Sequence, residues 1–377
     1  MTYKKTKVTT FVGTRPEIIR LSEIIKKFDL HFDHRLIHTG QNPDPQLKDV
    51  FFKDLGLRTP DAYFSDTHKS LGEFLANLFL ETEKELNEHR PDAVLILGDT
   101  NSALSAVLAK RFGIPIYHLE AGNRSFDANV PEEINRRLVD HISDFNFPYS
   151  ELARANLIAE GIHPRKISLM GSPLPEVLEN MKEKISNSRI LEALNLKPRE
   201  YFLVSTHRQE NVDSSVRLKS LLKTLNGLAQ KYDQKILVST HPRTRIRIDK
   251  IDSEIDSRII FHAPFNFSDY NALQLNARVV LSDSGTISEE TIMLGLRAIT
   301  IRDSMERPEA LEAGSIIMCG LETDHVIEAI EVLEGSEPVI NHPREYSFMD
   351  VSSRVTNVLL STVHQHKFWN GLHTLDQ

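Results

Sequence analysis

The alternation of short apolar runs with segments of helical period most constrains how this chain folds. Such runs, rich in Val, Ile and Leu, are typical of strands buried on both faces, and strands separated by helices indicate parallel sheets built from βαβ units. Strands are predicted over 7–12, 34–38, 92–97, 114–118, 166–170, 201–205, 235–239, 258–262, 278–282 and 297–301. Helices are predicted over 16–28, 70–89 and 101–112. The sequence therefore predicts an α/β fold with doubly wound sheets.

The length of 377 residues exceeds what one hydrophobic core usually serves, so two domains are expected. The polar, proline-containing stretch GSPLPE follows the last strand predicted in the first half and indicates a boundary there. We predict a Rossmann-like domain over 1–171 and a second over 172–354, with a helix over about 355–377 that packs back on the first. FVGTRPE and FLVSTHRQE are similar, because each ends a predicted strand with a turn and a basic residue. This similarity predicts two similar domains facing across a cleft.

Composition and charge exclude several classes of partner. The formal net charge of -8 provides no basic field for nucleic acid. The single cysteine, Cys319, cannot form an intrachain disulfide and fits a reducing compartment. The N-terminus lacks the apolar segment of a signal peptide, and no stretch approaches the roughly 20 apolar residues of a membrane span. A cytoplasmic protein without nucleic-acid or membrane partners is expected.

Polar residues gather directly after most of the predicted strands. In open α/β sheets, ligands bind beyond the carboxyl ends of the strands, so these clusters predict one pocket shared by both domains. The clusters are GTR (13–15), HTGQN (38–42), GDTNS (98–102), EAGNR (120–124), THRQEN (206–211), THPRTR (240–245), DSGTISEE (283–290) and RDSMERPE (302–309).

Ser284, Gly285 and Thr286 precede a predicted helix and present a pattern suited to a phosphate. Backbone N–H groups and the positive helix dipole favour an anion at such a turn. A plain N-cap with Glu289 or Glu290 as its partner is the alternative. Cationic residues at neighbouring strand ends are Arg15, His207, Arg243 and Arg307. Because they would otherwise be unpaired charges in one cleft, they favour a diphosphate ligand.

Several familiar motifs are absent from the sequence. It contains no G-x-x-x-x-G-K-[ST] and no G-x-G-x-x-G after a strand, which argues against a P-loop enzyme and against NAD or FAD. The histidines form no H-E-x-x-H, and one cysteine excludes a thiolate cage. A G-x-S-x-G nucleophile elbow is also missing. We expect no cofactor and no metal.

Acidic residues at strand ends are candidates for proton transfer. Asp99, Glu120 and Glu132 come from three separate strand ends, and with His207 they would supply acid and base groups on both faces of a sugar ring. Structural alternatives exist for individual residues, because Asp99 suits a helix N-cap and acids in a first helical turn complement the dipole.

Glu133 and Arg136 share the helix that Pro131 is predicted to open. Glu133 lies in the first turn, where a structural role as a dipole partner is favoured. Arg136 lies four residues after Glu132, so a pair within the helix is one interpretation. Binding of a carboxylate or phosphate by an arginine of this segment is the other.

The motifs occur in the order found in a known family. They are GTRPEIIR, HTGQN, GDTNS, EAGNR, PEEINRR, THRQEN, HPRTR, SGTISEE and MERPE, spread from about residue 7 to beyond 320. The chain resembles the non-hydrolysing UDP-N-acetylglucosamine 2-epimerases. The amino-acid sequences of four segments are most similar to those of the branch that forms UDP-N-acetyl-L-fucosamine from its L-talo C2 epimer. These segments are GTRPEIIRLS, EAGNRSFD, VPEEINRRLVDHISD and HPRTR.

The resemblance implies a fold like that of two-domain GT-B glycosyltransferases, with UDP held mainly by the C-terminal domain. It implies elimination of UDP to a glycal-type intermediate, proton exchange at C2 and re-addition of UDP, in a homodimer that serves capsule or O-antigen synthesis. The implied catalytic residues are Asp99, Glu120, Glu132 and His207, with Arg136 and His241 close by. The implied UDP-binding residues are Glu290 at the ribose and Ser284, Gly285, Thr286, Arg15 and Arg307 at the diphosphate.

Two positions depart from the usual family pattern. Arg20 stands where the common motif ends in Lys, so a planar guanidinium replaces a compact ammonium group at a substrate-binding position. Asn42 replaces the histidine of the TGQH-type motif that is associated with an allosteric substrate molecule. Activation by UDP-N-acetylglucosamine is therefore not expected.

Three other functions use the same residues. An epimerase that forms UDP-N-acetylmannosamine from UDP-N-acetylglucosamine differs only in its substrate. A GT-B glycosyltransferase would have the same fold and nucleotide-binding site but would need a second substrate as acceptor. It would introduce no solvent deuterium at C2 of the sugar. A sugar-nucleotide sensor would bind without turnover, and replacing Glu120 would change no rate.

Overall fold

The computed structural model describes residues 4–42, 49–127, 130–206, 214–240, 242–251, 254–336 and 343–371. The chain divides into two compact units. Unit 1 comprises Met1–Asn180 with Arg344–Gln377, and unit 2 comprises Met181–Pro343. The boundary predicted between residues 171 and 172 precedes this division, which falls within helix α7 (Leu174–Ser186).

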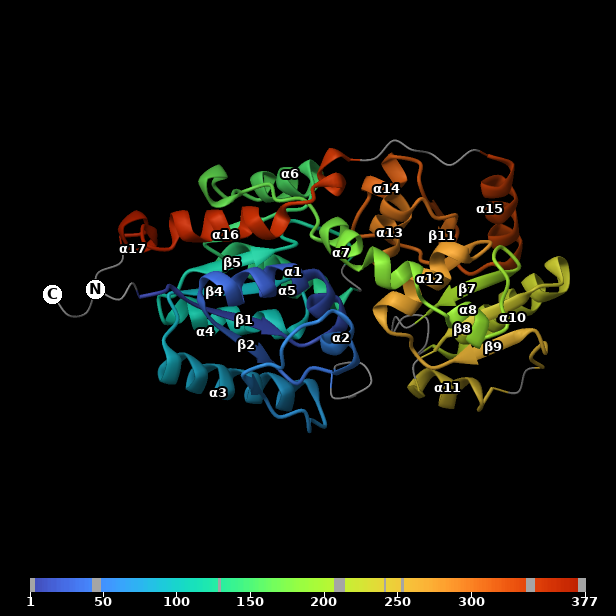
Figure 1. Ribbon diagram of the computed structural model, residues 1–377, viewed down its shortest axis with the longest axis horizontal. Helices are drawn as coiled ribbons and strands as arrows, with labels where there is room; N and C mark the ends of the chain where they lie inside the picture. Colours follow the sequence, from blue (N-terminus) through green and yellow to red (C-terminus); the bar gives the residue numbers. More distant parts are fainter. Residues whose placement is uncertain are drawn as a thin grey trace. The chain divides into compact units, whose positions relative to one another are not determined.

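Unit 1 is built on a six-stranded parallel sheet with the order β3-β2-β1-β4-β5-β6, of which Figure 1 labels β1, β2, β4 and β5. The strands are β1 (Lys7–Val12), β2 (Asp33–His38), β3 (Ala62–Tyr63), β4 (Ala93–Leu97), β5 (Ile116–Leu119) and β6 (Phe145–Phe147). The strand order reverses direction between β1 and β4, which are hydrogen-bonded neighbours. Loops that leave this switch point diverge to opposite faces of the sheet and leave room for a ligand.

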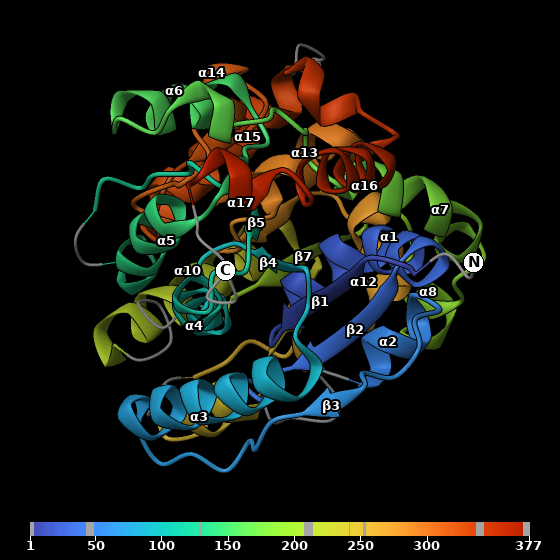
Figure 2. The same cartoon turned by 90° about the vertical axis from the view of Figure 1, so that its left-hand side faces the viewer.

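Helices cover both faces of this sheet. Phe11, Val94 and Ile96 pack with apolar residues of α3 and α4 in one core cluster, while α16 packs against α1. Figure 2 shows α3 and α4 on one side of the sheet and α1 and α16 on the other. The helices are α1 (Arg15–His31), α2 (Asp49–Asp54), α3 (Leu71–His89), η2 (Asn101–Leu104), α4 (Ser105–Arg111), α5 (Pro131–Ile142), α6 (Glu151–Ala159), η3 (Pro164–Lys166), η4 (Arg344–Ser347), α16 (Val351–Thr362) and α17 (His366–Trp369).

Unit 2 repeats the same topology, with the order β12-β11-β10-β7-β8-β9 and a switch point between β7 and β10. Side chains alternate along its strands: Phe202 and Val204 pack toward α10 and α15, whereas Tyr201 and Leu203 pack with residues of α12 and α13. The elements are β7 (Tyr201–Ser205), β8 (Lys235–Ser239), β9 (Ile259–His262), β10 (Val280–Ser282), β11 (Ala298–Thr300), β12 (Ile317–Met318), α8 (Ile190–Ala193), α10 (Ser215–Tyr232), α11 (Pro242–Ile248), α12 (Phe267–Asn276), α13 (Ile287–Leu294), α14 (Glu309–Glu312) and α15 (Thr323–Gly335).

The predicted α/β class with two doubly wound Rossmann-like domains is confirmed. The strand predicted over 166–170 is wrong. Ile167 forms only an isolated bridge to Asn146, and the neighbouring N–H groups of Ser168 and Met170 bond to the chain around the short strand β6. The segment thus runs along the sheet edge without forming a regular ladder. No helix in the described parts of the chain is long and apolar enough to cross a membrane.

Candidate functional site

The turn that follows β1 is held by the carboxylate of Glu17, which lies in the first turn of α1. Its Oε2 accepts hydrogen bonds from the backbone N–H groups of Gly13, at 2.6 Å, and of Thr14, at 2.7 Å. Its Oε1 accepts a hydrogen bond of 2.5 Å from the hydroxyl of Thr100. Burial raises the pKa of Glu17 to about 7, although these hydrogen bonds act in the opposite direction. Glu17 therefore joins the polar turns after β1 and β4.

Gly13 allows three strand ends of unit 1 to approach closely. A Cβ atom at this position would lie 2.0 Å from Oγ of Ser102 and 2.2 Å from Oγ1 of Thr39. These two hydroxyls are hydrogen-bonded to each other at 2.7 Å, and Gln41 Oε1 accepts from the Ser102 backbone N–H at 2.9 Å. The clusters GTR, HTGQN and GDTNS therefore meet at one edge of the sheet, as their positions after parallel strands predict.

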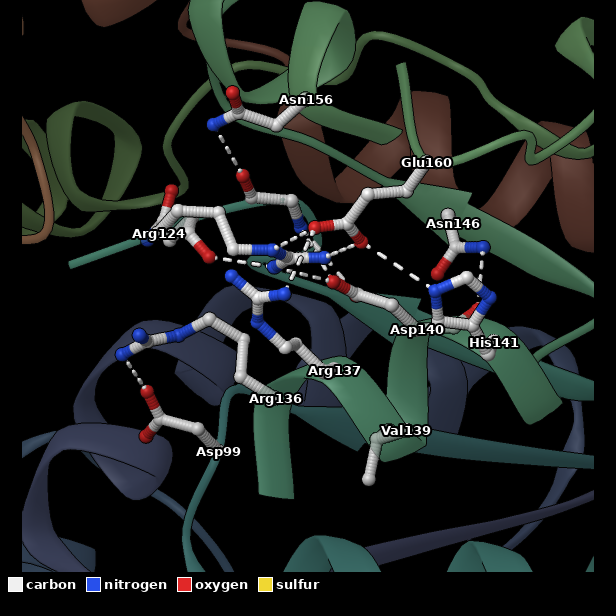
Figure 3. Close-up of polar contacts among 12 residues, drawn as sticks. Asp99, Arg124, Arg136, Arg137, Val139, Asp140, His141, Asn146, Asn156 and Glu160 are labelled. Atoms are coloured by element: carbon white, nitrogen blue, oxygen red, sulfur yellow. Dashed lines mark hydrogen bonds and ion pairs between the residues drawn. The ribbon is translucent and has the colours of Figure 1, made fainter. Parts of the chain in front are cut away.

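Asp99 follows β4 and is bound by Arg136 of α5. Arg136 donates from Nη2 to Asp99 Oδ2 and from Nη1 to Glu133 Oε2, the latter at 2.6 Å. Asn135 fixes the same turn by donating to the backbone carbonyl of Asp99 at 3.0 Å. Figure 3 shows Asp99 and Arg136 meeting from separate elements. Arg136 is buried, so it holds this carboxylate with little competition from water.

Glu133 has a structural role in the same helix. Its carboxylate accepts hydrogen bonds from the backbone N–H and the hydroxyl of Ser125, and Arg137 donates to it at 3.1 Å. Burial raises the pKa of Glu133, but the Ser125 N–H and the two guanidiniums outweigh burial and lower it. These contacts agree with the structural interpretation, with ion pairs added to the expected dipole interaction.

Glu120 ends β5 in a left-handed backbone conformation, with φ of 65°. Such a conformation is strained for a residue with a side chain and is often found at functional sites. Arg20 of α1 donates from Nη1 to Glu120 Oε2, and both side chains are buried. The guanidinium of Arg20 also lies over the ring of Tyr149, 5.8 Å from its centroid. A Cβ at Gly98 would lie 3.9 Å from Glu120 Cδ, which places Glu120 beside the end of β4.

Arg124 anchors the EAGNR loop from the interior of unit 1. Its Nη1 lies 2.8 Å from Asp140 Oδ2, and its Nε and Nη2 bind the carboxylate of Glu160 at 2.8 and 2.5 Å (Figure 3). Asp140 also accepts from the backbone N–H of Gly122 at 3.1 Å, and His118 Nδ1 lies 3.0 Å from its other oxygen. The Arg124 guanidinium lowers the pKa of Glu160. This cluster fixes the loop that begins with Glu120, a role that sequence reasoning missed.

The other predicted residues of unit 1 lie at the ends of helices. Glu132 is half-buried in the first turn of α5. Arg15 is half-buried at the first position of α1, with its guanidinium 5.7 Å from the ring centroid of Phe51. Among the residues predicted in unit 2, His207 and His241 lie outside the described residues. Arg243 lies in α11, and its side chain is outside the described part of the chain.

In unit 2, the Ser284–Thr286 turn leads from β10 into α13. Ser284 Oγ lies 2.9 Å from Thr286 Oγ1 and accepts from the Thr286 backbone N–H at 3.3 Å. Arg307, from the segment after β11, donates to the backbone carbonyl of Gly285, and its Nε lies 3.8 Å from Glu289. The structure therefore brings together Ser284, Gly285, Thr286 and Arg307.

Glu290 and Arg302 complete the polar groups around α13 and the segment after β11. Glu290 is half-buried and accepts from Gln274 Nε2 at 2.7 Å. Arg302 binds both carboxylate oxygens of Glu306, at 2.6 and 2.9 Å, and both residues are buried. This bidentate pair fixes the RDSMERPE segment that carries Arg307. Sequence reasoning did not single out Arg302, although a cation followed four residues later by an acid is a recognisable signal.

Two Rossmann-like domains, with paired carboxylates and arginines at strand ends and a helix-opening Ser-Gly-Thr turn, are typical of enzymes that act on nucleotide-linked substrates. A family model described as UDP-N-acetylglucosamine 2-epimerase matches residues 26–360. The chain belongs to this family and is a UDP-sugar 2-epimerase.

Individual relatives agree with the family assignment. The UDP-N-acetylglucosamine 2-epimerase of Methanocaldococcus jannaschii is 38% identical over 338 residues, covering 87% of this chain and 92% of that protein. Its structure in complex with UDP-GlcNAc and UDP is 34% identical and has a TM-score of 0.88, covering 94% of this chain and 100% of that chain. The structure of UDP-N-acetylglucosamine 2-epimerase from Rickettsia bellii is 42% identical and has a TM-score of 0.90, covering 97% and 100%.

A further relative carries a different name. The UDP-2,3-diacetamido-2,3-dideoxy-D-glucuronate 2-epimerase of Pseudomonas aeruginosa is 30% identical over 358 residues, covering 94% of this chain and 99% of that protein. Proteins similar to this chain are therefore named for more than one UDP-sugar.

Proposed function

We propose that this protein epimerises a UDP-2-acetamido sugar at C2 by eliminating UDP to a glycal-type intermediate and adding it back. In the first step the C1–O bond breaks, UDP leaves with the electron pair, and a protein base takes the C2 proton. In the second step an acid returns a proton to the opposite face of C2 while the UDP oxygen re-forms the bond to C1. The reaction is balanced without an oxidant or reductant.

The pairing of two strand-end carboxylates with buried arginines supports this proposal most strongly. Arg136 binds Asp99 and Arg20 binds Glu120, and these acids follow β4 and β5, which are neighbouring strands. A carboxylate held in a fixed position can act as a general base, and the arginines hold these two carboxylates in place. We assign proton transfer to Asp99, Glu120 and Glu132, with His207 as a further acid/base group.

Departure of UDP requires that its developing negative charge be stabilised. We assign this task to the diphosphate-binding residues, because the Ser284–Thr286 turn presents N–H groups at the start of a helix and Arg307 contributes a cation beside it. Glu290 would hold the ribose hydroxyls. The remaining proposed substrate-binding residues are Arg15, Arg20, Arg136, His241 and Arg243.

For the substrate, we propose UDP-2-acetamido-2,6-dideoxy-L-talose, converted to UDP-N-acetyl-L-fucosamine. The amino-acid sequences of the GTRPEIIRLS, EAGNRSFD and HPRTR motifs support the branch of the family that forms UDP-N-acetyl-L-fucosamine. Arg20 in place of lysine supports the same branch. UDP-N-acetylglucosamine is the second candidate, because the relatives from M. jannaschii and R. bellii are named for it.

Proton NMR in heavy water tests both the reaction and the substrate. The purified protein is incubated separately with UDP-N-acetylglucosamine and with the L-talo 6-deoxy sugar nucleotide. We expect deuterium at C2 and the inverted epimer with the second compound. Faster turnover of UDP-N-acetylglucosamine would reassign the substrate. Consumption of the nucleotide sugar only with an added acceptor, and without deuterium at C2, would indicate a glycosyltransferase.

A further inference from the structure

Glu17 occupies the switch point of the unit 1 sheet, where the loops after β1 and β4 diverge. Its two carboxylate oxygens face different loops. Oε2 binds the backbone N–H groups of Gly13 and Thr14, and Oε1 binds the hydroxyl of Thr100. Glu17 is 1% exposed, whereas Thr100 is half-buried. One carboxylate therefore ties together the turn before Arg15 and the turn that carries Asp99.

The contact with Thr100 is not needed to start helix α1. An acid at the third helical position that reaches back to the N-cap N–H is an ordinary helix-capping arrangement, and Oε2 alone performs it here. Oε1 bonds instead to a residue 83 positions further along the chain. This second contact links α1 to the turn that carries Asp99.

The Asp99 turn is held from two sides. On one side, α5 supplies Asn135, which donates to the Asp99 carbonyl, and Arg136, which binds the Asp99 carboxylate. On the other side, Glu17 of α1 holds the adjacent residue, Thr100. Asn135 also donates to Asn101 Oδ1 at 3.0 Å, so α5 contacts the residues on both sides of Thr100, and Glu17 adds the hydrogen bond to the Thr100 hydroxyl from α1.

We infer that Glu17 is a positioning residue for the epimerase reaction, which sets the orientation of the Asp99 carboxylate through the hydroxyl of Thr100. This inference rests on the proposed role of Asp99 in proton transfer. Glu17 itself does not touch the substrate in this scheme. Displacement of a reacting group by about 1 Å can cost 100-fold in rate, so loss of one anchor is expected to lower turnover.

Thr100→Val tests the inference, because it removes the hydroxyl at nearly constant volume and leaves the Oε2 contacts of Glu17 in place. We expect kcat and the rate of deuterium incorporation at C2 to fall about 10-fold or more, with KM changed by less than about twofold. Thr100→Ser restores the hydroxyl and is expected to recover most of the rate. Thr100→Ala serves as a second variant with the same expectation as Thr100→Val.

Thr82→Val is the matched control. Thr82 is buried in α3, and its hydroxyl has no hydrogen-bond partner among the residues that the structure describes. The same substitution there is expected to leave kcat unchanged. Thermal unfolding of each variant separates loss of folded protein from loss of turnover.

The outcomes distinguish this inference from the proposed function. If the wild-type protein places no deuterium at C2 of any UDP-sugar, the proposed function fails. If the wild-type protein is active and folded Thr100→Val retains its kcat, or if Thr100→Ser loses as much as Thr100→Val, the positioning role of Glu17 is overturned. A selective fall in kcat that serine rescues supports it.

Discussion

The guanidinium of Arg20 donates a hydrogen bond to the carboxylate of Glu120, and both side chains are buried in unit 1. Each charge therefore helps to compensate the other. Removing one partner of a buried pair leaves an uncompensated charge, whereas replacing a charge by a smaller cation preserves neutrality. This relationship allows the roles of the two residues to be separated by substitution.

Glu120→Gln is expected to lower kcat by roughly 100-fold or more, the usual scale for loss of a positioned acid or base. The amide keeps the size of the side chain but cannot accept the C2 proton. Steady-state kinetics and deuterium incorporation at C2 measure the effect. If Glu120→Gln, Asp99→Asn and Glu132→Gln all retained wild-type turnover, the assignment of proton transfer to these acids would be refuted.

Arg20→Lys and Arg20→Met form a matched pair. Lysine keeps a cation beside Glu120, so we expect its activity to exceed that of the methionine variant. Methionine leaves the buried Glu120 carboxylate without this partner, which is expected to destabilise the fold by about 3 kcal/mol or to protonate the acid. Urea unfolding and kcat measurements report both effects. Equal behaviour of the two variants would show that the charge at Arg20 is unimportant.

The stability contributed by Glu17 depends on pH in a definite direction. Its pKa is raised from 4.5 to about 7 in the folded protein, so between these values the folded state binds more protons than the unfolded state. The free energy of unfolding therefore falls as pH rises through this window, by roughly 3 kcal/mol in all. Glu17→Gln should lack this contribution. Urea unfolding of both proteins at several pH values from about 4.5 to 7 checks the prediction, and parallel pH dependences would contradict it.

Arg124→Met should destabilise unit 1 by about 3–5 kcal/mol, because it leaves the buried carboxylate of Asp140 without its arginine. Arg137→Met provides the control. The side chain of Arg137 is 47% exposed and lies 3.8 Å from Glu160, which Arg124 also binds. Arg137 donates to Glu133 at 3.1 Å, but Glu133 keeps Arg136, so the loss of Arg137 is expected to cost less than about 1 kcal/mol. Chemical denaturation measures both. Equal losses would remove the distinction between a buried anchor and a surface pair.

Arg307→Ala should weaken UDP binding by about 10-fold or more, because it removes a cation beside the Ser284–Thr286 turn. Arg278→Ala is the control, since Arg278 pairs with Glu334 and lies just before β10, at the opposite end of that strand from the turn. Calorimetric titration with UDP gives the affinities. A change confined to thermal stability would favour a purely structural role for Arg307.

Most of the long strands were predictable because their apolar runs are continuous. Lys7–Val12, Tyr201–Ser205 and Lys235–Ser239 coincide with the predicted segments. The strands that the sequence did not reveal are the short ones. Phe145–Phe147 contains a buried Asn146, whose amide donates to the Asp140 carbonyl, and this polar residue interrupts the apolar signal. Such strands form because a neighbouring strand offers hydrogen bonds, which depends on the assembled sheet.

Some residues of the candidate site were likewise predictable from the sequence, and others were not. The positions of Asp99 and Glu120 were predictable because each follows a buried strand, and parallel strands bring their carboxyl ends to one edge. Glu17 and Asp140 were not identified, because both lie within helices and gain their roles from partners distant in the chain. Nothing in their local sequence distinguishes them from ordinary helix acids.

The sequence alone determined the α/β class, the doubling of one sheet topology and the strand ends at which polar residues gather, because these depend on local apolar pattern and on residues adjacent in the chain. Only the tertiary structure decided which charges meet. It paired Arg20 with Glu120, Arg136 with Asp99 and Arg124 with Asp140, because the energy of a buried ion pair depends on distance and desolvation, which are set by packing between segments far apart in the chain.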